Sequence, residues 1–347
     1  MRLADRPLRV VHLVVTDAFA GTERYVANLA AATVRLGHAV EVIGGNRERM
    51  RANLPPEVGV HPAADLRTAT ITLRRTTRPD VVHAHLTAAE VAAVAAWPGR
   101  HRPVLVSTRH IAARRGRSAP GRAAAVAVRA RLDAQVAISR FVADAVDGVS
   151  EVILTGVPDA DTLSDAGDRP TVLVAQRLEA EKDTSTALRA WALSGLAEEG
   201  WRLVVAGDGA ESAWLQAVVL RSGLQGSVRM VGQVDDLGRR MGSAAIFLAT
   251  APAEPLGLSV VEAMARALPV VATSAGGHLE TVGAVPEALV FPPGDAAAAA
   301  AALRSLAGDP VRRRAYGAAL QAHQRRHLSL EPFAGLMVEL YRRVLRA

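Results

Sequence analysis

The feature of this chain that most constrains its fold is a repeating pattern: a short apolar run, a Gly or polar break, then an amphipathic stretch. Apolar runs that alternate with helices are typical of parallel strands covered on both faces. After the first run, Tyr25, Leu29, Thr33 and Leu36 lie at helical spacing. The strand-like runs of the first half are 9–15, 39–44, 80–84, 103–107, 134–139 and 151–157. We predict one doubly wound α/β domain over residues 1–157.

The pattern stops over residues 158–170, which are rich in Asp, Ala and Gly and predict a linker. Strand-like runs then resume at 171–175, 202–206, 228–231, 245–249, 269–273 and 289–291. An alanine tract follows Asp295, a good N-cap residue, and predicts a further helix. We therefore expect a second doubly wound domain over residues 171–329, with a cleft between the two. Functional residues should lie just after strands, where such sheets bind ligands.

The composition excludes several classes of function. The chain has no cysteine, which rules out disulfides and thiolate chemistry. Lys182 is the only lysine among 41 basic residues, a bias typical of GC-rich coding, so the net charge of +7 does not indicate nucleic acid. The apolar run 10–15 is too short to span a membrane. We expect a cytoplasmic protein with no nucleic-acid partner.

One segment is locally basic. Eight arginines lie from Arg102 to Arg131, with no acidic residue before Asp133 and no aromatic residue for base stacking. An electropositive face there would favour an anionic acceptor or the anionic inner face of a membrane. The alternative is an ordinary solvated arginine face.

The strongest local signal is the segment AEPLGLSVVEAMA, which contains Glu254 and Glu262. Pro255 and Gly257 keep its first half non-helical, and a helix is predicted from Ser259 onward, with Glu262 in its first turn. The free N–H groups of that turn would bind an anion, and two carboxylates beside it suit a ligand with hydroxyl groups. The alternative is a capping box formed by Ser259 and Glu262, which leaves Glu254 unexplained.

A second cluster follows the run 171–175. Arg177 and Lys182 lie just past this strand-like run, where two fixed cations would neutralise a leaving diphosphate without a metal ion. The alternative is a surface ion pair with Glu179 or Glu181.

Weaker signals follow strands in the first half. Gly21 allows close approach of the backbone to a phosphate or sugar. His110 would hydrogen-bond a sugar hydroxyl or share developing charge, unless its role is structural. We interpret His83 and His85 as pointing to opposite faces of their strand, and hence as core or rim residues that cannot form a metal pair.

Together these motifs resemble those of the family 4 retaining glycosyltransferases, which have the GT-B fold of two Rossmann-like domains. The similar segments are 20–23, 80–85, 137–139, 176–182, 254–262, 276–280 and 291–295. The family's last helix packs back onto the N-terminal domain, which suits residues 330–347. A helix is predicted there with an apolar face of Phe333, Leu336, Met337, Leu340, Tyr341 and Val344.

The resemblance implies a site for a nucleoside-diphosphate sugar, UDP- or GDP-linked, with no metal and no cofactor. Its parts would be Arg177 and Lys182 on the diphosphate, the backbone of Leu258 and Ser259 on phosphate, Glu262 on the ribose, Glu254 and His110 on the sugar, and Gly21 near the diphosphate. His110, Arg177, Lys182 and Glu254 would be catalytic. The family usually has Gly, Asn and Gly where Gln176, Thr155 and Ala267 stand, and Gln176 would narrow the donor pocket.

The function predicted is a retaining transfer of a hexose-type sugar to a hydroxyl acceptor, such as a glycolipid, a polysaccharide or a small metabolite. The acceptor hydroxyl would attack the face from which the nucleoside diphosphate leaves. The alternatives are an epimerase or phosphorylase of GT-B-like fold, a binding protein without catalysis, and a metal-dependent transferase using Asp159 and Asp161. The last is disfavoured because that pair lies in the predicted linker.

Overall fold

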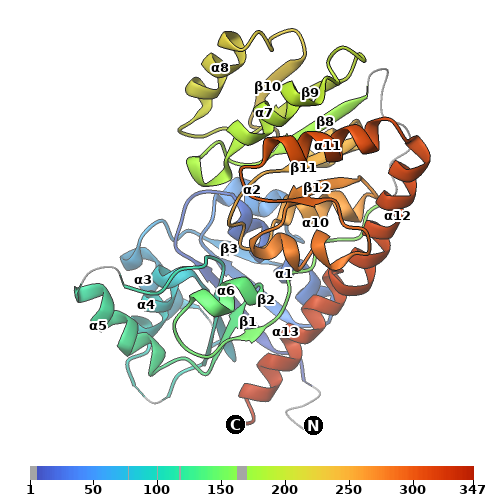
Figure 1. Cartoon of the computed structure of the whole chain (residues 1–347). Coiled ribbons are helices and arrows are strands. Elements are labelled where there is room, and N and C mark those ends of the chain that lie inside the picture. The colour runs from blue at the N-terminus through green and yellow to red at the C-terminus, as the bar shows by residue number, and fades with distance from the viewer. Residues whose placement is uncertain (1–5, 77, 100, 117–118, 162–169) are drawn as a thin grey trace. The chain divides into compact units, whose positions relative to one another are not determined.

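The computed structural model describes residues 6–76, 78–99, 101–116, 119–161 and 170–347, and it divides into two compact units. Unit 1 comprises Met1–Gly156 with Leu330–Ala347, and unit 2 comprises Val157–Ser329. Each unit contains a parallel sheet with helices packed on it (Figure 1). The predicted class, α/β with two doubly wound halves, is confirmed.

Unit 1 is built on seven parallel strands in the order β3-β2-β1-β4-β5-β6-β7. The strands are β1 (Arg9–Val14), β2 (Ala39–Ile43), β3 (Gly59–His61), β4 (Val81–His85), β5 (Val104–Arg109), β6 (Ala134–Ala137) and β7 (Glu151–Val152). The helices are α1 (Gly21–Arg35), α2 (Arg47–Ala52), α3 (Leu66–Arg75), α4 (Leu86–Ala96), α5 (Ala119–Arg129), α6 (Arg140–Ala145) and α13 (Leu330–Val344). The strand order reverses between β1 and β4, and the loops after these two strands therefore open toward a ligand position.

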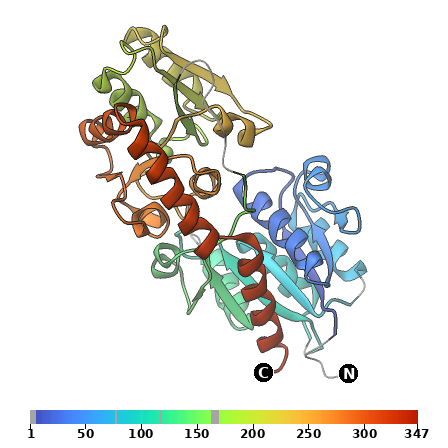
Figure 2. The same ribbon diagram turned by 90° about the vertical axis from the view of Figure 1, so that its right-hand side faces the viewer.

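The last helix, α13, belongs to unit 1, where it packs against α1 and β5 (Figures 1 and 2). Phe333 and Tyr341 are buried in this contact, as its apolar face predicts. Leu336 was expected on the same face but is 52% exposed, because Ala334 and Val338 take the buried positions.

Unit 2 has six parallel strands in the order β10-β9-β8-β11-β12-β13. They are β8 (Thr171–Ala175), β9 (Arg202–Ala206), β10 (Val228–Gly232), β11 (Ile246–Ala249), β12 (Val270–Thr273) and β13 (Val290–Phe291). The helices are α7 (Thr184–Ser194), α8 (Ser212–Arg221), α9 (Leu237–Gly242), α10 (Leu258–Ala265), α11 (Ala296–Ala307) and α12 (Pro310–His327), with short 3-10 turns η1 (Ala180–Lys182), η2 (Gly276–Leu279) and η3 (Val282–Ala284). Its order reverses between β8 and β11.

The remaining differences from the sequence patterns are local. Strand β3 was not predicted, since a three-residue edge strand is too short to show a period. Strand β7 ends at Val152, well before the predicted end of its run, and Val157 instead bridges to Ser329 within unit 2. The predicted linker, 158–170, falls largely on 162–169, outside the described residues.

None of the helices in the described parts of the chain combines the length and the apolar character that a membrane crossing needs.

Candidate functional site

The candidate site of unit 2 lies at the carboxyl ends of β8, β11 and β12, beside the point where the strand order reverses. The loop after β8 carries Arg177 and Lys182, and the loop after β11 carries Glu254. The loop after β12 carries His278. Because the strands are parallel and adjacent, these three loops meet at one edge of the sheet.

Lys182 and Glu254 are in direct contact, although they lie far apart in the sequence. The distance from Lys182 Nζ to Glu254 Oε2 is 2.6 Å, and the two side chains are 14% and 17% exposed. The resemblance assigns these residues to the diphosphate and to the sugar. The structure brings a cation and a carboxylate together at the edge where a ligand of such a sheet binds.

The backbone around Lys182 is held by a small polar network. The side-chain amide of Gln176 donates to the carbonyl oxygen of Lys182 at 3.0 Å and lies 3.0 Å from Thr184 Oγ1. Thr250 Oγ1 donates to the same carbonyl at 3.1 Å. Asp183 follows in a left-handed conformation, with φ of 46°, and caps α7. The amide of Gln176, expected to narrow a pocket, therefore bonds to the loop that carries Lys182.

Glu254 is positioned by close packing between two loops. The backbone N–H of Gly277 donates to the carbonyl oxygen of Glu254 at 2.7 Å. A Cβ atom at Gly276 would lie 2.5 Å from that same carbonyl oxygen, and one at Gly277 would lie 2.5 Å from Leu256 Cα. These two glycines, considered as pocket lining from the sequence, serve here to let the Glu254 loop pack closely.

His278 lies near this pair, whose charges both act on it, and is 1% exposed. Its Nδ1 is 2.8 Å from Thr273 Oγ1, which donates to the carbonyl oxygen of Ala251 and so fixes the ring. Burial lowers the pKa of His278 to about 4, with smaller opposing effects of Glu254 and Lys182. The imidazole is therefore neutral at physiological pH and adds no charge to the site.

Helix α10 begins one residue earlier than predicted. It starts at Leu258, and its N-cap is Gly257 with φ of 90°. Ser259 therefore lies inside the helix, and the capping box with Glu262 is wrong. Glu262 falls in the second turn and not the first, because Gly257 supplies the turn that Ser259 was expected to make. The backbone N–H groups of Leu258 and Ser259 lie in the first turn, where helices bind anions.

Arg177 is not part of the Lys182–Glu254 contact. Its guanidinium pairs with Glu181 at 2.7 Å, and both side chains are more than half exposed. This is the surface pair considered as the alternative from the sequence, and such exposed pairs contribute about 0–1 kcal/mol. Breaking the Arg177–Glu181 pair therefore costs little free energy.

Unit 1 contains the other two predicted site residues. Gly21 is the exposed first residue of α1, and Glu23 Oε2 accepts the N–H of Ala20 just before it. His110 follows β5 and is 8% exposed. Its ring packs edge-on against Tyr25, with centroids 4.7 Å apart.

The prediction that His83 and His85 point to opposite faces is wrong. Residues two apart in a strand share a face, and their ring centroids are 4.2 Å apart. With His12 they offer ligand atoms within 4.8 Å of one another, a spacing that a metal ion could use. Both ring nitrogens of His83 are already bonded, to Tyr341 at 2.6 Å and to Thr108 at 2.7 Å. His83 would therefore have to give up one of these two hydrogen bonds to bind an ion.

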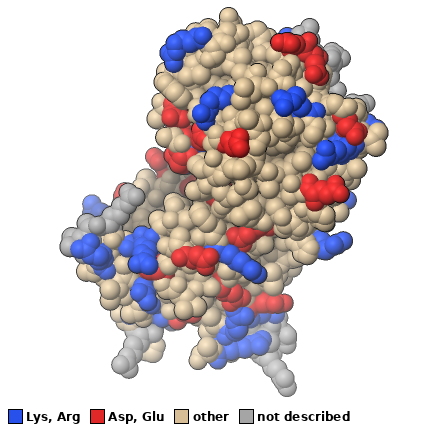
Figure 3. Space-filling model, in the orientation of Figure 1, with Lys and Arg blue, Asp and Glu red and all other residues tan. Residues whose placement is uncertain are grey.

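The arginine-rich segment is less basic at the surface than its sequence suggests. Arg115 is buried against Glu90 and Asp147, and Arg102 pairs with Asp133 at 2.6 Å. Arg117 lies outside the described residues. On the face shown in Figure 3, basic and acidic side chains are interspersed. The sequence missed this pairing because Glu90 and Asp147 lie outside the segment.

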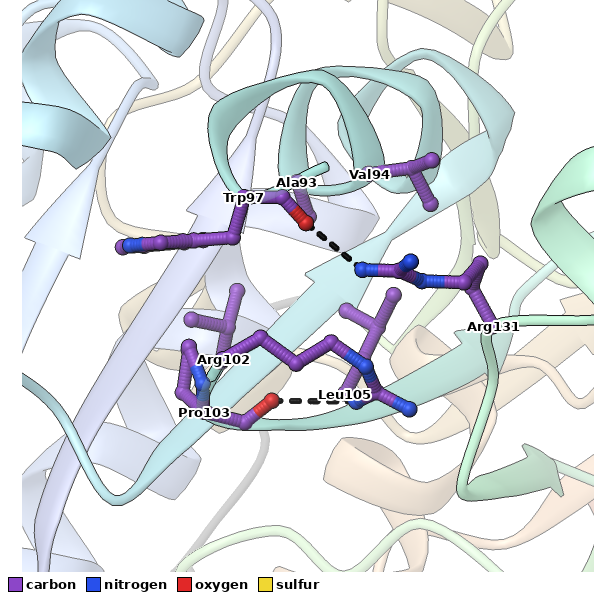
Figure 4. Close-up of a pocket in the computed structure, with 8 residues that line it drawn as sticks. Ala93, Val94, Trp97, Arg102, Pro103, Leu105 and Arg131 are labelled. Carbon is purple, nitrogen blue, oxygen red and sulfur yellow. Dashed lines mark hydrogen bonds between the residues drawn. The ribbon is translucent and has the colours of Figure 1, made fainter. Parts of the chain in front are cut away.

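The pocket drawn in Figure 4 is not a nucleotide site. It lies near the amino-terminal ends of β4 and β5, and Arg131 closes it by donating to the carbonyl oxygen of Trp97 at 2.6 Å. Its volume is about 10 Å³, close to the smallest that holds one water molecule. The sheet edge that carries Lys182 and Glu254 remains the candidate.

Two family models match the chain. Residues 19–160 match the model described as Glycosyltransferase Family 4, and residues 160–322 match the model described as Glycosyl transferases group 1. The first match lies on unit 1 and the second on unit 2, apart from a few residues at their shared boundary.

Relatives and solved structures agree with these two family matches. The chain is 29% identical over 350 residues to the 2-deoxystreptamine N-acetyl-D-glucosaminyltransferase of Streptomyces fradiae, covering 89% of this chain and 79% of that one. It is 30% identical over 149 residues to an exopolysaccharide phosphotransferase of Streptomyces coelicolor, covering 42% of this chain but only 16% of that protein. The structure of Anabaena HepE in complex with UDP and glucose has a TM-score of 0.80 at 19% identity, over 96% of this chain and 99% of that chain.

Proposed function

The chain belongs to family 4 of the glycosyltransferases and has the GT-B fold, and from this premise we propose that it is a retaining, metal-independent hexosyltransferase. The observation that supports the proposal most directly is the contact of Lys182 Nζ with Glu254 Oε2 at 2.6 Å. A nucleoside-diphosphate sugar presents a diphosphate next to sugar hydroxyls, and this pair offers one cation and one hydroxyl acceptor side by side.

In the proposed reaction, the bond from the anomeric carbon to the diphosphate oxygen breaks as the bond to the acceptor oxygen forms on the same face. The acceptor proton passes to the departing phosphate. Lys182 and Arg177 stabilise the charge that develops there, which a preorganised cation does without reorganisation. The backbone of Lys182 is fixed by the bonds to its carbonyl oxygen, and its ammonium is held by Glu254.

The other assignments follow the resemblance. The carboxylate of Glu254 accepts hydrogen bonds from hydroxyl groups of the transferred sugar, Glu262 binds the ribose, and the first turn of α10 binds phosphate. Gly21 and His110 keep the roles implied for them, near the diphosphate and on the sugar.

The proposed donor is UDP- or GDP-linked, and UDP comes first because HepE binds it. The proposed acceptor is a hydroxyl of a glycolipid, a polysaccharide or a small metabolite, the last in line with the aminocyclitol named for the Streptomyces fradiae relative. We place the enzyme in the cytoplasm. Contact with an anionic membrane surface would use exposed arginines of the 102–131 segment, Arg114 and Arg129 among them.

A thermal-shift series with UDP, GDP, ADP and dTDP tests the donor site, since a ligand that binds the folded state raises its melting temperature. We expect UDP or GDP to raise it in the presence of EDTA, and Glu254→Gln and Lys182→Ala to weaken the shift for the sugar nucleotide. If none of the four nucleotides shifts the melting temperature, the donor assignment fails.

Product analysis separates transfer from the alternatives. A transferase forms a glycoside with an added acceptor and keeps the anomeric configuration of the donor sugar. An epimerase returns a changed sugar nucleotide with no acceptor present, and such a product would refute the proposal.

A further inference from the structure

Three buried histidines of unit 1 form a continuous hydrogen-bonded chain. His12 Nδ1 lies 3.1 Å from His85 Nε2, and His85 Nδ1 lies 3.1 Å from His110 Nε2. The three come from β1, the end of β4 and the residue after β5. The chain thus leads from the middle of the sheet to its carboxyl edge.

All three rings are neutral in the folded protein. Burial lowers the pKa of His12 and His110 to about 3 and holds that of His85 well below its usual range. A neutral imidazole carries one N–H donor and one bare nitrogen acceptor. Each N···N contact therefore contains one proton. The nitrogen that carries the proton in one ring then determines which nitrogen carries it in the next ring.

Only two arrangements satisfy both contacts. In the first, all three rings carry the proton on Nδ1, and His110 presents an Nδ1–H at the outer end. In the second, all three carry it on Nε2, and His110 presents a bare nitrogen there. A mixed arrangement places two protons, or two lone pairs, against each other in one contact.

The inner end of the chain distinguishes the two. His12 Nε2 is buried and has no hydrogen-bond partner among the described residues. In the second arrangement it would be an N–H donor sealed in the core, and orphaned buried N–H groups are rarer in proteins than under-used acceptors. In the first arrangement it is only an unused acceptor.

We propose that His12 and His85 are positioning residues that hold His110 in its Nδ1–H form, so that His110 acts as a fixed hydrogen-bond donor to an oxygen atom of the substrate. This inference rests on the proposed function, in which His110 contacts the sugar. Nδ1 of His110 has no partner of its own among the described residues, and is left for the ligand.

Other side chains pack around the three histidines and hold their rings in place. Tyr25 packs edge-on against both His110 and His85, at centroid distances of 4.7 and 5.5 Å. His83 is held by Tyr341 and Thr108 and packs against His85 without joining the chain. Turning over any of the three rings would break its contact with the neighbouring histidine.

Long-range ¹H–¹⁵N correlation spectra of the labelled protein at pH 7 report the tautomer of each histidine directly. Single substitutions at His12, His85 and His110 assign the signals. We expect all three rings to be neutral and protonated on Nδ1, the opposite of the form that prevails for histidine in water. A ring protonated on Nε2 or on both nitrogens, at any of the three positions, overturns the proposal.

The variant His85→Leu tests the coupling. It removes the partner of His110 Nε2, and we expect the ¹⁵N resonance of that atom to move to the position of a nitrogen that accepts no hydrogen bond. His101→Asn, at an exposed site, should leave the signal in place. An unmoved resonance in a folded His85→Leu protein contradicts the coupling, and if that variant does not fold, the tautomers of the wild-type protein decide.

Deoxyfluoro sugar donors connect the tautomer to catalysis, because fluorine can accept a hydrogen bond but cannot donate one. The sugar position that His110 contacts is the one where His110→Ala no longer distinguishes the natural donor from its deoxy analogue. At that position we expect the wild-type enzyme to retain a higher kcat/KM with the fluoro donor than with the deoxy donor. Equal loss with both analogues would show that His110 accepts a hydrogen bond, and would refute the inference. An enzyme with no activity on any sugar nucleotide would refute the proposed function instead and leave the spectra as the test.

Discussion

Acid should destabilise unit 1 through its buried histidines, and His12 is the cleanest place to measure the effect. Burial lowers the pKa of His12 from 6.5 to about 3. The titratable rings beside it are His83, His85 and, in contact with His85, Tyr25. As the pH falls below about 6.5, the unfolded chain binds a proton at this position and the folded chain does not. Stability is therefore lost on acidification, down to the pKa of the folded state.

The size of the effect follows from the two pKa values. Each pH unit between them changes the free energy of unfolding by about 1.4 kcal/mol per histidine. From pH 7 to pH 5, His12 alone should then remove about 2 kcal/mol, a large share of the stability of an ordinary domain. His110, with a pKa also of about 3, should contribute a similar amount.

Urea unfolding followed by circular dichroism at pH 7 and pH 5 gives the pH dependence, and a comparison of variants isolates one histidine. His12→Phe keeps a ring in the core but cannot bind a proton. We expect the wild-type protein to lose about 2 kcal/mol more than His12→Phe between the two pH values. His101→Asn, at an exposed position, should behave as the wild type. If His12→Phe shows the full wild-type pH dependence, His12 is not a buried neutral residue and the argument fails.

Three further predictions concern unit 2. Lys182→Ala should lower kcat by about 10²–10³-fold, as the loss of one preorganised charge-stabilising group does. The steady-state rate of nucleoside diphosphate release measures kcat, and an unchanged value would show that Lys182 is not catalytic. Gln176→Ala should reduce stability by about 1 kcal/mol through the lost bond to the Lys182 carbonyl and should lower kcat more than it raises KM, so a change in KM alone would argue against a positioning role. Ala267 has φ of 56°, a left-handed conformation that glycine adopts without strain. Ala267→Gly should raise the free energy of unfolding by about 0.5–1 kcal/mol, because the relief of strain exceeds the entropy that glycine loses on folding. A lower melting temperature would contradict this.

The fold could be predicted from the sequence because each apolar run had to be a buried parallel strand. The patterns located β8 and β9 to the residue. The short edge strand β3 escaped, since three residues show no period. The exposure of Leu336 could not be predicted either. Ala334 and Val338 are apolar as well, and only packing against α1 decides which of these residues is buried.

The site could be predicted only in part, for a different reason. Sequence order shows that Lys182 and Glu254 both follow strands, but not that β8 and β11 are neighbours, which is what brings the two side chains together. The histidine chain was missed outright. Its members come from two strands and from the residue after a third, and the interpretation of His83 and His85 ignored that residues two apart share a face of a strand.

The ligand-free pairing of Lys182 with Glu254 has a consequence for donor binding. A charge left unpaired in a site that is more than four-fifths buried costs several kcal/mol, and both side chains are in that range. If the donor binds as proposed, Lys182 exchanges a carboxylate for the diphosphate while Glu254 exchanges an ammonium for sugar hydroxyls. Neither charge is then isolated before or after binding. Free UDP offers Lys182 its new partner but offers Glu254 none, so the complete sugar nucleotide should bind more tightly than UDP, and Glu254→Gln should narrow that difference.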